Sequence, residues 1–215
     1  LNAQDAISKG AKIYTNANIQ KVIRKRDNWE VFLNNGEVLY SKVIINASGP
    51  YALDVLNDLI GIQSQKKIRH VQGSHIITEK LYKGEQAYIL QLDDKRIIFL
   101  IPYLDKYTLI GTTDHEVKSY DNPKITDIEK KYLISSVNKF IKNKITEDNI
   151  IWTYSGVRPL VEDLNENASK ITRDYTFEID DKDAPILTVF GGKLTTFRKL
   201  SEHALEKISK YIKIS

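Results

Sequence analysis

The chain has 215 residues, of which 41% are hydrophobic and 28% charged, and its formal net charge is +4. This composition is that of a folded globular protein with one large domain or two interleaved ones. The chain contains no cysteine, which excludes disulfides, thiolate metal sites and cysteine nucleophiles. Its four histidines lack metal-ligand spacing, so no metal site is predicted. The lysines are not interleaved with aromatic residues, and a nucleic-acid partner is not expected.

The first third of the chain predicts a helix, a small β-meander and one buried strand. The helix ends near Gly10, and an Asn-Asn-Gly turn at 34–36 indicates a hairpin. An apolar run at 42–46 is typical of a strand that is covered on both faces. A second helix has a proline in its first turn and ends near Gly61. The strands of the meander are predicted at 19–24, 29–33 and 37–40.

The middle of the chain is rich in short β-type runs. A capping box formed by Thr126 and Glu129 predicts the start of a helix among them. We therefore expect an antiparallel sheet with helices on one side. The strands are predicted at 71–78, 87–92, 96–102, 107–111, 150–154 and 175–179. The apolar side chains expected to face the core from the helix are Ile128, Tyr132, Leu133, Val137, Phe140 and Ile141.

The last elements return to an α/β pattern. An apolar strand at 186–190 leads into two glycines at 191–192, and Thr195 or Thr196 is expected to cap the helix that follows. Such a turn directs backbone N–H groups and a positive helix end at a bound anion, and Lys193 adds a full charge. The turn lacks the glycine and Ser/Thr spacing of a P-loop. The buried face of the helix is expected to contain Leu194, Phe197, Leu200, Ala204, Leu205 and Ile208.

These patterns predict two domains of different class, one α/β and one α+β. The two ends of the chain, residues 1–66 and 186–215, are expected to form the first domain. Residues 67–185 are expected to form a second domain that is inserted into the first. Ligands often bind where such domains meet.

Polar and cationic residues mark the candidate site. Arg158, Arg173 and Lys193 indicate a compact anionic substrate. Taken by itself, Arg173 is explained better by a surface pair with Asp174. His75 is a candidate proton acceptor, and a structural histidine is the alternative. Because no nucleophile pattern accompanies them, the chemistry is expected to come from a bound cofactor. The clusters concerned are 46–50, 73–75, 154–159, 171–175 and 111–114, the last of which a simple turn explains equally well.

Six short segments occur in an order that resembles FAD-dependent glycerol-3-phosphate dehydrogenases of the aerobic type. They are 44–50 (IINASGP), 73–75 (GSH), 111–114 (GTTD), 155–160 (SGVRPL), 172–175 (TRDY) and 191–196 (GGKLTT). The resemblance covers essentially the whole chain. It implies a partial FAD-binding domain of the glutathione-reductase type with an inserted antiparallel-sheet substrate domain.

The resemblance also implies a reaction and its partners. In this family sn-glycerol 3-phosphate is oxidised to dihydroxyacetone phosphate by hydride transfer to FAD, and the electrons pass to quinone. The implied location is the cytoplasm, peripheral on the inner face of the cell membrane, where the enzyme attaches to the membrane surface without spanning it. A homodimer is a further expectation.

Individual roles follow from the same resemblance. Arg158 is expected beside the substrate, where it polarises the C2 oxygen or binds the anion, and His75 is expected to accept the hydroxyl proton. Arg173 and Lys193 are expected to hold the phosphate or the anionic edge of the flavin. The positions expected to contact FAD are Ile19 near the adenine, Ala47, Ser48 and Gly49 near the diphosphate, and Gly192, Lys193, Leu194, Thr195 and Thr196 near the pyrimidine end of the flavin.

Three features of the family do not occur in these residues: the Gly-x-Gly-x-x-Gly turn, the basic substrate residues near that turn, and the helical cap after the final helix. We therefore expect a central part of the enzyme that binds FAD poorly and is inactive when alone. One alternative is an oxygen-using glycerophosphate oxidase, which carries an insertion after the Arg-Pro motif. The short interval between Pro159 and Arg173 favours the dehydrogenase. A second alternative is a non-catalytic fragment of a split gene.

Overall fold

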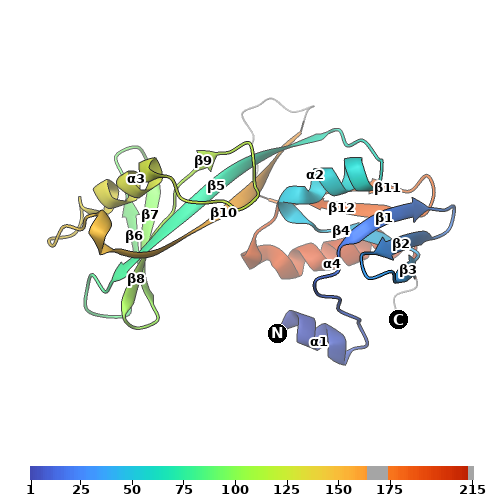
Figure 1. The fold of residues 1–215 in the computed structure, drawn as a ribbon, viewed down its shortest axis with the longest axis horizontal. Coiled ribbons are helices and arrows are strands. Elements are labelled where there is room, and N and C mark those ends of the chain that lie inside the picture. The colour runs from blue at the N-terminus through green and yellow to red at the C-terminus, as the bar shows by residue number, and fades with distance from the viewer. Residues whose placement is uncertain (164–173, 213–215) are drawn as a thin grey trace. The chain divides into compact units, whose positions relative to one another are not determined.

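The computed structural model describes residues 1–163 and 174–212, with side chains for all of these except 162 and 163 (Figure 1). The chain divides into two compact units: the first combines Leu1–Gln65 with Arg173–Ser215, and the second is Lys66–Thr172. The helices are α1 (Asn2–Ser8), α2 (Ala52–Asp54), α3 (Asp127–Val137) and α4 (Phe197–Ile208). The strands are β1 (Ile19–Arg24), β2 (Trp29–Leu33), β3 (Val38–Ser41), β4 (Ile44–Asn46), β5 (Lys66–Glu79), β6 (Tyr88–Gln91), β7 (Ile97–Tyr103), β8 (Tyr107–Gly111), β9 (His115–Glu116), β10 (Ile150–Asp163), β11 (Thr176–Asp180) and β12 (Ile186–Phe190).

In the first unit, strands β1, β2 and β3 form the predicted antiparallel meander. Trp29 is fully buried, and its Nε1 donates a hydrogen bond of 2.9 Å to the carbonyl of Pro185. Arg24 donates to the carbonyl of Ala184 and forms an ion pair of 2.6 Å with Asp180. The meander is therefore attached to the chain segment that precedes β12, which is about 160 residues distant in sequence.

A three-stranded sheet forms the centre of the same unit. Strand β12 lies in its middle, parallel to β4 and antiparallel to β11, and is buried along its whole length. Helix α4 packs Ala204 and Ile208 onto Leu187 and Val189 of β12, and α2 lies on the other side of the sheet (Figure 1). Strand β4 was expected to be covered on both faces, but Ile45 is 44% exposed because its face of the strand borders a cleft.

The position of β11 corrects the predicted domain boundary. The sequence placed residues 175–179 in the inserted domain, yet β11 pairs with β12 along its full length. Phe177 and Ile179 pack against the cluster that contains Leu187. The division therefore falls after residue 172 and not after 185, because a strand pattern does not indicate which sheet the strand will join.

The second unit is an antiparallel sheet in the order β10-β5-β8-β7-β6, with β9 paired to β5. Helix α3 begins with the predicted capping box and packs Leu133 and Val137 onto one face of this sheet, against Ile76 and Ile110 (Figure 1). On the opposite face, large side chains such as Trp152 are exposed. The sheet therefore has one face buried by a helix and one face open to a ligand or partner.

Both long helical segments expose apolar side chains that were expected in the core. Ile128 in the first turn of α3 is 80% exposed, and Phe140, which follows the end of that helix, is 48% exposed. Leu194, Phe197 and Leu205 at α4 are exposed as well. A helix buries only the stripe that faces its partner, and these residues lie outside that stripe. Within the described residues, no helix is long and apolar enough to cross a membrane.

Candidate active site

The register of the second sheet brings the candidate catalytic residues to one face. His75 of β5 lies opposite Tyr154 of β10 and opposite Gly111 of β8. Gly73 lies two residues from His75 on β5, and Arg158 lies four residues from Tyr154 on β10, so both point to the same face of the sheet as His75. Because residues that face each other across antiparallel strands share a face, the imidazole and the guanidinium lie on the face opposite to α3.

Two glycines provide the space for these side chains. A Cβ atom at Gly73 would lie 2.1 Å from Nη2 of Arg158, and one at Gly111 would lie 2.1 Å from Cδ2 of His75. The guanidinium therefore lies over one glycine and the imidazole over the other. This contact gives a physical reason for glycine in the segments 73–75 and 111–114, where any larger residue would displace the candidate catalytic groups.

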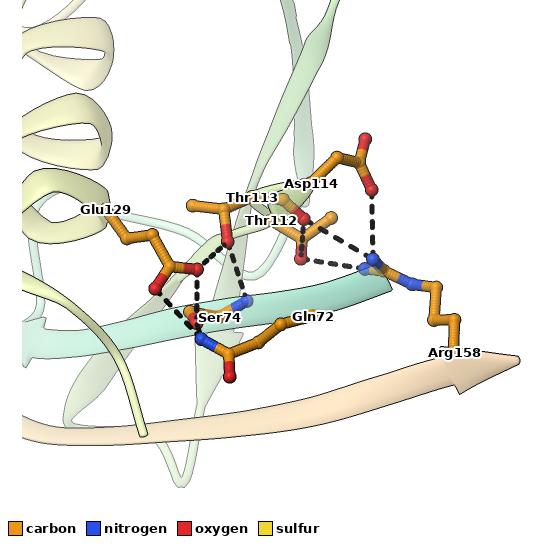
Figure 2. A network of polar contacts seen from close by, with 7 residues as sticks. All are labelled: Gln72, Ser74, Thr112, Thr113, Asp114, Glu129 and Arg158. Atoms are coloured by element: carbon orange, nitrogen blue, oxygen red, sulfur yellow. Dashed lines mark hydrogen bonds and ion pairs between the residues drawn. The ribbon is translucent and has the colours of Figure 1, made fainter. Parts of the chain in front are cut away.

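Residues 112–114 hold Arg158 in place (Figure 2). Its Nη2 donates 2.9 Å to the hydroxyl of Thr112, and its Nη1 donates 3.4 Å to the carbonyl oxygen of Thr113. The same Nη1 forms an ion pair of 3.0 Å with Asp114. The side chain remains 35% exposed, so the guanidinium is both oriented and accessible to an anion. The segment that a simple turn could have explained thus contacts the candidate substrate-binding arginine.

His75 is held as a neutral imidazole. Its ring stacks on Tyr154 with 4.7 Å between the ring centroids and 6° between the ring planes. Burial, and second the nearby charge of Arg158, lower the pKa of His75 from its ordinary value. Within the described part of the chain, its Nδ1 is buried and has no hydrogen-bond partner. A neutral imidazole is able to accept a proton at the ring nitrogen that does not carry the hydrogen.

The first unit contains a cleft of about 820 Å³ between β1, β4 and α2. Ile19, Ala47 and Ser48 line it, as do the carboxylates of Asp54 and Asp58. Its walls are largely apolar, with Ile44 and Ile45 among the residues that form them. Of the nine positions expected to contact FAD, these three lie together at one cavity, whereas Gly49 follows them in the chain without lining it.

Asn46 fixes the backbone that forms one wall of the cleft. It is buried, and its Nδ2 donates 2.9 Å to the carbonyl of Ala52. Its Oδ1 accepts hydrogen bonds from the backbone N–H and the hydroxyl of Ser48. Gly49 then adopts a φ of +61°, a conformation that favours glycine. The segment 46–50 is therefore a turn organised by one buried amide, which the sequence identified only as a run of small residues.

The glycine turn before α4 has the predicted form. Gly191 and Gly192 have φ values of +71° and +102°, and a 3₁₀ turn, Leu194–Thr196, precedes the helix. Thr196 is the N-cap residue of α4, but its hydroxyl accepts from the backbone N–H of Lys193 and makes no side-chain cap to α4. The prediction that a threonine occupies the N-cap position is therefore confirmed for Thr196, but the predicted hydrogen bond from its side chain to the helix N-terminus is absent.

Of the two further cations expected at the phosphate or the flavin edge, the structure describes Lys193 but not Arg173. Lys193 lies 3.6 Å from a carboxylate oxygen of Asp174, and both side chains are largely exposed. The partner that the sequence offered to Asp174 was Arg173, which lies outside the described residues. Among the described residues, no group of three or more His, Asp or Glu side chains has an arrangement that would hold a metal ion.

Several residues of the site were not selected from the sequence. Thr112 and Asp114 belong to the cluster 111–114, whose sequence does not indicate that it orients an arginine, and Tyr154 is one member of the cluster 154–159 with no predicted role of its own. The sequence indicates Glu129 only as a helix cap, although it also accepts hydrogen bonds from Ser74 in β5 and from Thr113, which follows β8 (Figure 2). Gln72 is a polar residue on the buried face of β5. Its position two residues before Ser74 and four before Ile76 places it on that face, and a polar residue there is the sequence signal that could have indicated a buried polar contact.

Comparisons with known proteins agree with this architecture. Residues 1–198 match the model of the family described as FAD dependent oxidoreductase. The chain is 42% identical to the aerobic glycerol-3-phosphate dehydrogenase of Escherichia coli (strain K12), over 98% of this chain and 44% of that protein. It is 39% identical to the D-erythritol 1-phosphate dehydrogenase of Brucella abortus (strain 2308), over 97% of this chain and 43% of that protein.

The fold of this chain is also found in a solved structure of an FAD-containing enzyme. The structure of the glycerol-3-phosphate dehydrogenase from Bacillus halodurans complexed with FAD superposes with a TM-score of 0.81 at 23% identity, over 96% of this chain and 41% of that chain. The chain thus spans less than half the length of the relatives it matches. Because the family model covers nearly all of the sequence and both units, the chain belongs to the family of FAD-dependent oxidoreductases.

Proposed function

We propose that the protein oxidises sn-glycerol 3-phosphate to dihydroxyacetone phosphate with FAD as its cofactor. The observation that carries this proposal is the pair formed by Arg158 and His75, which lie on one open sheet face with a glycine beneath each side chain. The pair occurs in a chain that is 42% identical to an enzyme named for this substrate. A neutral base accepts the hydroxyl proton and a fixed cation stabilises the charge that develops on the oxygen, while the hydride requires FAD as its acceptor.

Arg158 binds the substrate in this proposal. Its guanidinium is oriented by Thr112, Thr113 and Asp114 and is accessible, so it donates hydrogen bonds either to the phosphate or to the C2 oxygen. At the C2 oxygen, a fixed cation stabilises the negative charge that develops as the proton leaves. We propose that Arg173 and Lys193 supply further positive charge to the phosphate or to the flavin edge.

His75 accepts the proton of the substrate hydroxyl. Its lowered pKa keeps the imidazole unprotonated near neutral pH, as a general base requires. The stacked ring of Tyr154 fixes the plane of the imidazole. The charge of Arg158 disfavours the imidazolium, so the transferred proton does not remain on His75 when the product leaves.

The first unit has features that fit FAD. The cleft has apolar walls suited to an aromatic ring, and Asp54 and Asp58 suit sugar hydroxyls better than phosphates. Ile19, Ala47, Ser48 and the adjacent Gly49 would hold the adenosine and diphosphate part. The turn formed by Gly192, Lys193, Leu194, Thr195 and Thr196 would present N–H groups and a charge to the flavin. When bound, FAD supplies the acceptor for the hydride from the carbinol carbon.

The remaining expectations extend the proposal to the intact enzyme. Quinone is the proposed electron acceptor, and the proposed location is the inner face of the cell membrane, with a homodimer as the proposed assembly. Their support is the set of ordered segments shared with aerobic glycerol-3-phosphate dehydrogenases. Rapid mixing of the reduced enzyme with oxygen and with a short-chain quinone tests the acceptor. Fast reoxidation by oxygen would favour the oxidase instead.

A second candidate substrate is D-erythritol 1-phosphate, which the 39% identity to the Brucella abortus enzyme favours. Both substrates are polyol phosphates, and Arg158 would serve either one. The test is anaerobic addition of each compound to the FAD-loaded intact enzyme while the visible flavin absorption is recorded. We expect glycerol 3-phosphate to bleach the flavin at the lower concentration. Bleaching by erythritol 1-phosphate alone would replace the proposed substrate, and bleaching by neither would contradict the proposal.

A further inference from the structure

Glu129 is a buried carboxylate in the first turn of α3, with 4% of its surface exposed. Its Oε1 accepts hydrogen bonds from the hydroxyls of Thr113 (2.6 Å) and Ser74 (2.7 Å). Its Oε2 accepts from Nε2 of Gln72 (2.9 Å) and from the backbone N–H and the hydroxyl of Thr126 (2.9 and 3.0 Å). Burial alone would raise the pKa of Glu129, but the hydrogen bonds from Thr113, Thr126 and Ser74 outweigh it and lower the pKa. The carboxylate is therefore ionised near neutral pH.

Thr113 connects this carboxylate to Arg158 (Figure 2). Its hydroxyl donates to Glu129 and accepts from the backbone N–H of Ser74 at 2.9 Å, so the side chain is fixed from two sides. Its carbonyl oxygen accepts from Nη1 of Arg158 and from the hydroxyl of Thr112. The hydroxyl of Thr112 in turn accepts from Nη2 of Arg158. A continuous series of hydrogen bonds thus leads from the start of α3 to the guanidinium.

Helix capping explains only part of this arrangement. The capping box uses Oε2, which accepts the backbone N–H of Thr126. Oε1 takes no part in that motif and is directed at the strand and at Thr113. A glutamate that served the helix alone would not need the hydroxyls of Ser74 in β5 and of Thr113, which follows β8, on its second oxygen.

We propose that Glu129 is a positioning residue for Arg158, which it acts on by fixing Thr113 and hence the segment 112–114. This inference deepens the proposed function and rests on it for its kinetic test. Loss of the Oε1 contacts leaves Thr113 without its buried acceptor and frees the segment that orients the guanidinium. The effect of Glu129 on catalysis then depends on Arg158 being present.

The kinetic test is a double-mutant cycle in the intact, FAD-loaded enzyme. Glu129→Gln places an amide N–H₂ group among partners that are all donors. We expect kcat/KM for glycerol 3-phosphate to fall about ten-fold, a typical effect of losing a hydrogen bond to a charged group. In the Arg158→Lys background the same substitution is expected to change kcat/KM by less than about two-fold. Equal losses in the two backgrounds would overturn the inference, because a purely structural role would be additive.

Two matched variants separate positioning from helix stability. Thr126→Ala removes the hydroxyl that accepts from the backbone N–H of Glu129 and donates to Oε2, and it leaves Thr113 and Ser74 on Oε1. It should therefore lower the melting temperature while kcat/KM stays within about two-fold. Thr113→Val should reproduce the kinetic loss of Glu129→Gln, and Thr113→Ser should recover most of it because it keeps the hydroxyl. If Glu129→Gln does not fold, the Thr113 pair still decides the question.

A second readout does not require the substrate. Hydrogen exchange of the peptide that covers residues 111–116 should be at least about ten-fold faster in Glu129→Gln and Thr113→Val and unchanged in Thr126→Ala. If glycerol 3-phosphate fails to reduce the wild-type enzyme, the proposed function is wrong and this exchange still reports on the positioning role. Unchanged exchange in Glu129→Gln and Thr113→Val would overturn the inference by itself.

Discussion

Single residues show most clearly how local space determines the candidate chemistry. Gly73 and Gly111 occupy positions where a Cβ atom would overlap Arg158 and His75. The printed sequence shows that these positions are glycine, but only the strand register shows which side chains need the space. Candidate catalytic residues were therefore predictable as residue types, and the contacts that orient them were not.

Gly73→Ala should impair catalysis without unfolding the protein. The atoms that a new Cβ meets belong to the end of the flexible Arg158 side chain, which can move at small cost in stability. We expect kcat/KM to fall about ten-fold because the guanidinium leaves its bonds to Thr112 and Asp114. Gly156→Ala is the matched control, since no atom lies within 4 Å of a Cβ there. Wild-type kinetics in Gly73→Ala would show that the guanidinium position does not matter.

The pH dependence of kcat/KM should contain an acidic limb that belongs to His75. Burial and then the charge of Arg158 lower its pKa, so this limb is expected below pH 6.5. Arg158→Gln removes the second cause, and the limb should move to higher pH in that variant. The substrate phosphate also titrates, with a pKa of about 6. The pH profile of His75→Gln is therefore measured together with that of the wild type, because a limb that is present in both belongs to the substrate. A profile identical in wild type and His75→Gln would exclude this residue as the base.

The same pKa shift affects stability. The folded state binds the proton of His75 less readily than the unfolded state, because the folded pKa lies below the ordinary value of 6.5. Stability contributed by the neutral imidazole is therefore complete above pH 6.5 and decreases as the pH falls through the folded pKa. Denaturant titrations of the wild type and of His75→Gln at several pH values should show this decrease in the wild type only.

At the level of elements, local patterns predicted most strands and the helix starts. The predicted bounds of β1, β2 and β8 match the structure, and the capping box of α3 is present. The same patterns failed where long-range packing decides. Residues 176–180 form a strand as expected but join the other sheet, and Leu194 precedes α4 in an exposed 3₁₀ turn. Which sheet a strand joins and which stripe of a helix is buried depend on partners that are distant in the sequence.

The glycine turn before α4 gives a test at this scale. Gly192 has a φ of +102°, and a Cβ there would lie 3.0 Å from Cδ1 of Leu200. Gly192→Ala should destabilise the protein by about 1–2 kcal/mol and weaken FAD binding, because the turn presents Lys193 and the N–H groups that follow. Gly36→Ala, in the turn between β2 and β3, is the control, since its φ of +85° gives similar strain with no atom within 4 Å and it does not line the cleft. Equal FAD affinity in the two variants, measured by flavin fluorescence, would exclude this turn from the cofactor site.

At the level of the whole molecule, one unit is assembled from both ends of the chain and the other from its middle. The sequence predicted this arrangement because the α/β pattern of the first strands returns at residue 186. The candidate groups divide in the same way: the cleft and the glycine turn belong to the first unit, whereas Arg158 and His75 belong to the second. The family model extends over both, which is consistent with a cofactor and a substrate served by different units.

The most direct test of this account is the anaerobic reduction of bound flavin by glycerol 3-phosphate in the intact enzyme and in its Arg158→Ala variant. Flavin content is first matched by the visible spectrum, since the cleft of the first unit does not contain Arg158. The account predicts that the substrate bleaches the wild-type flavin and that the rate falls at least about 100-fold in the variant, which has lost its fixed cation. Bleaching of the variant at the wild-type rate would contradict it.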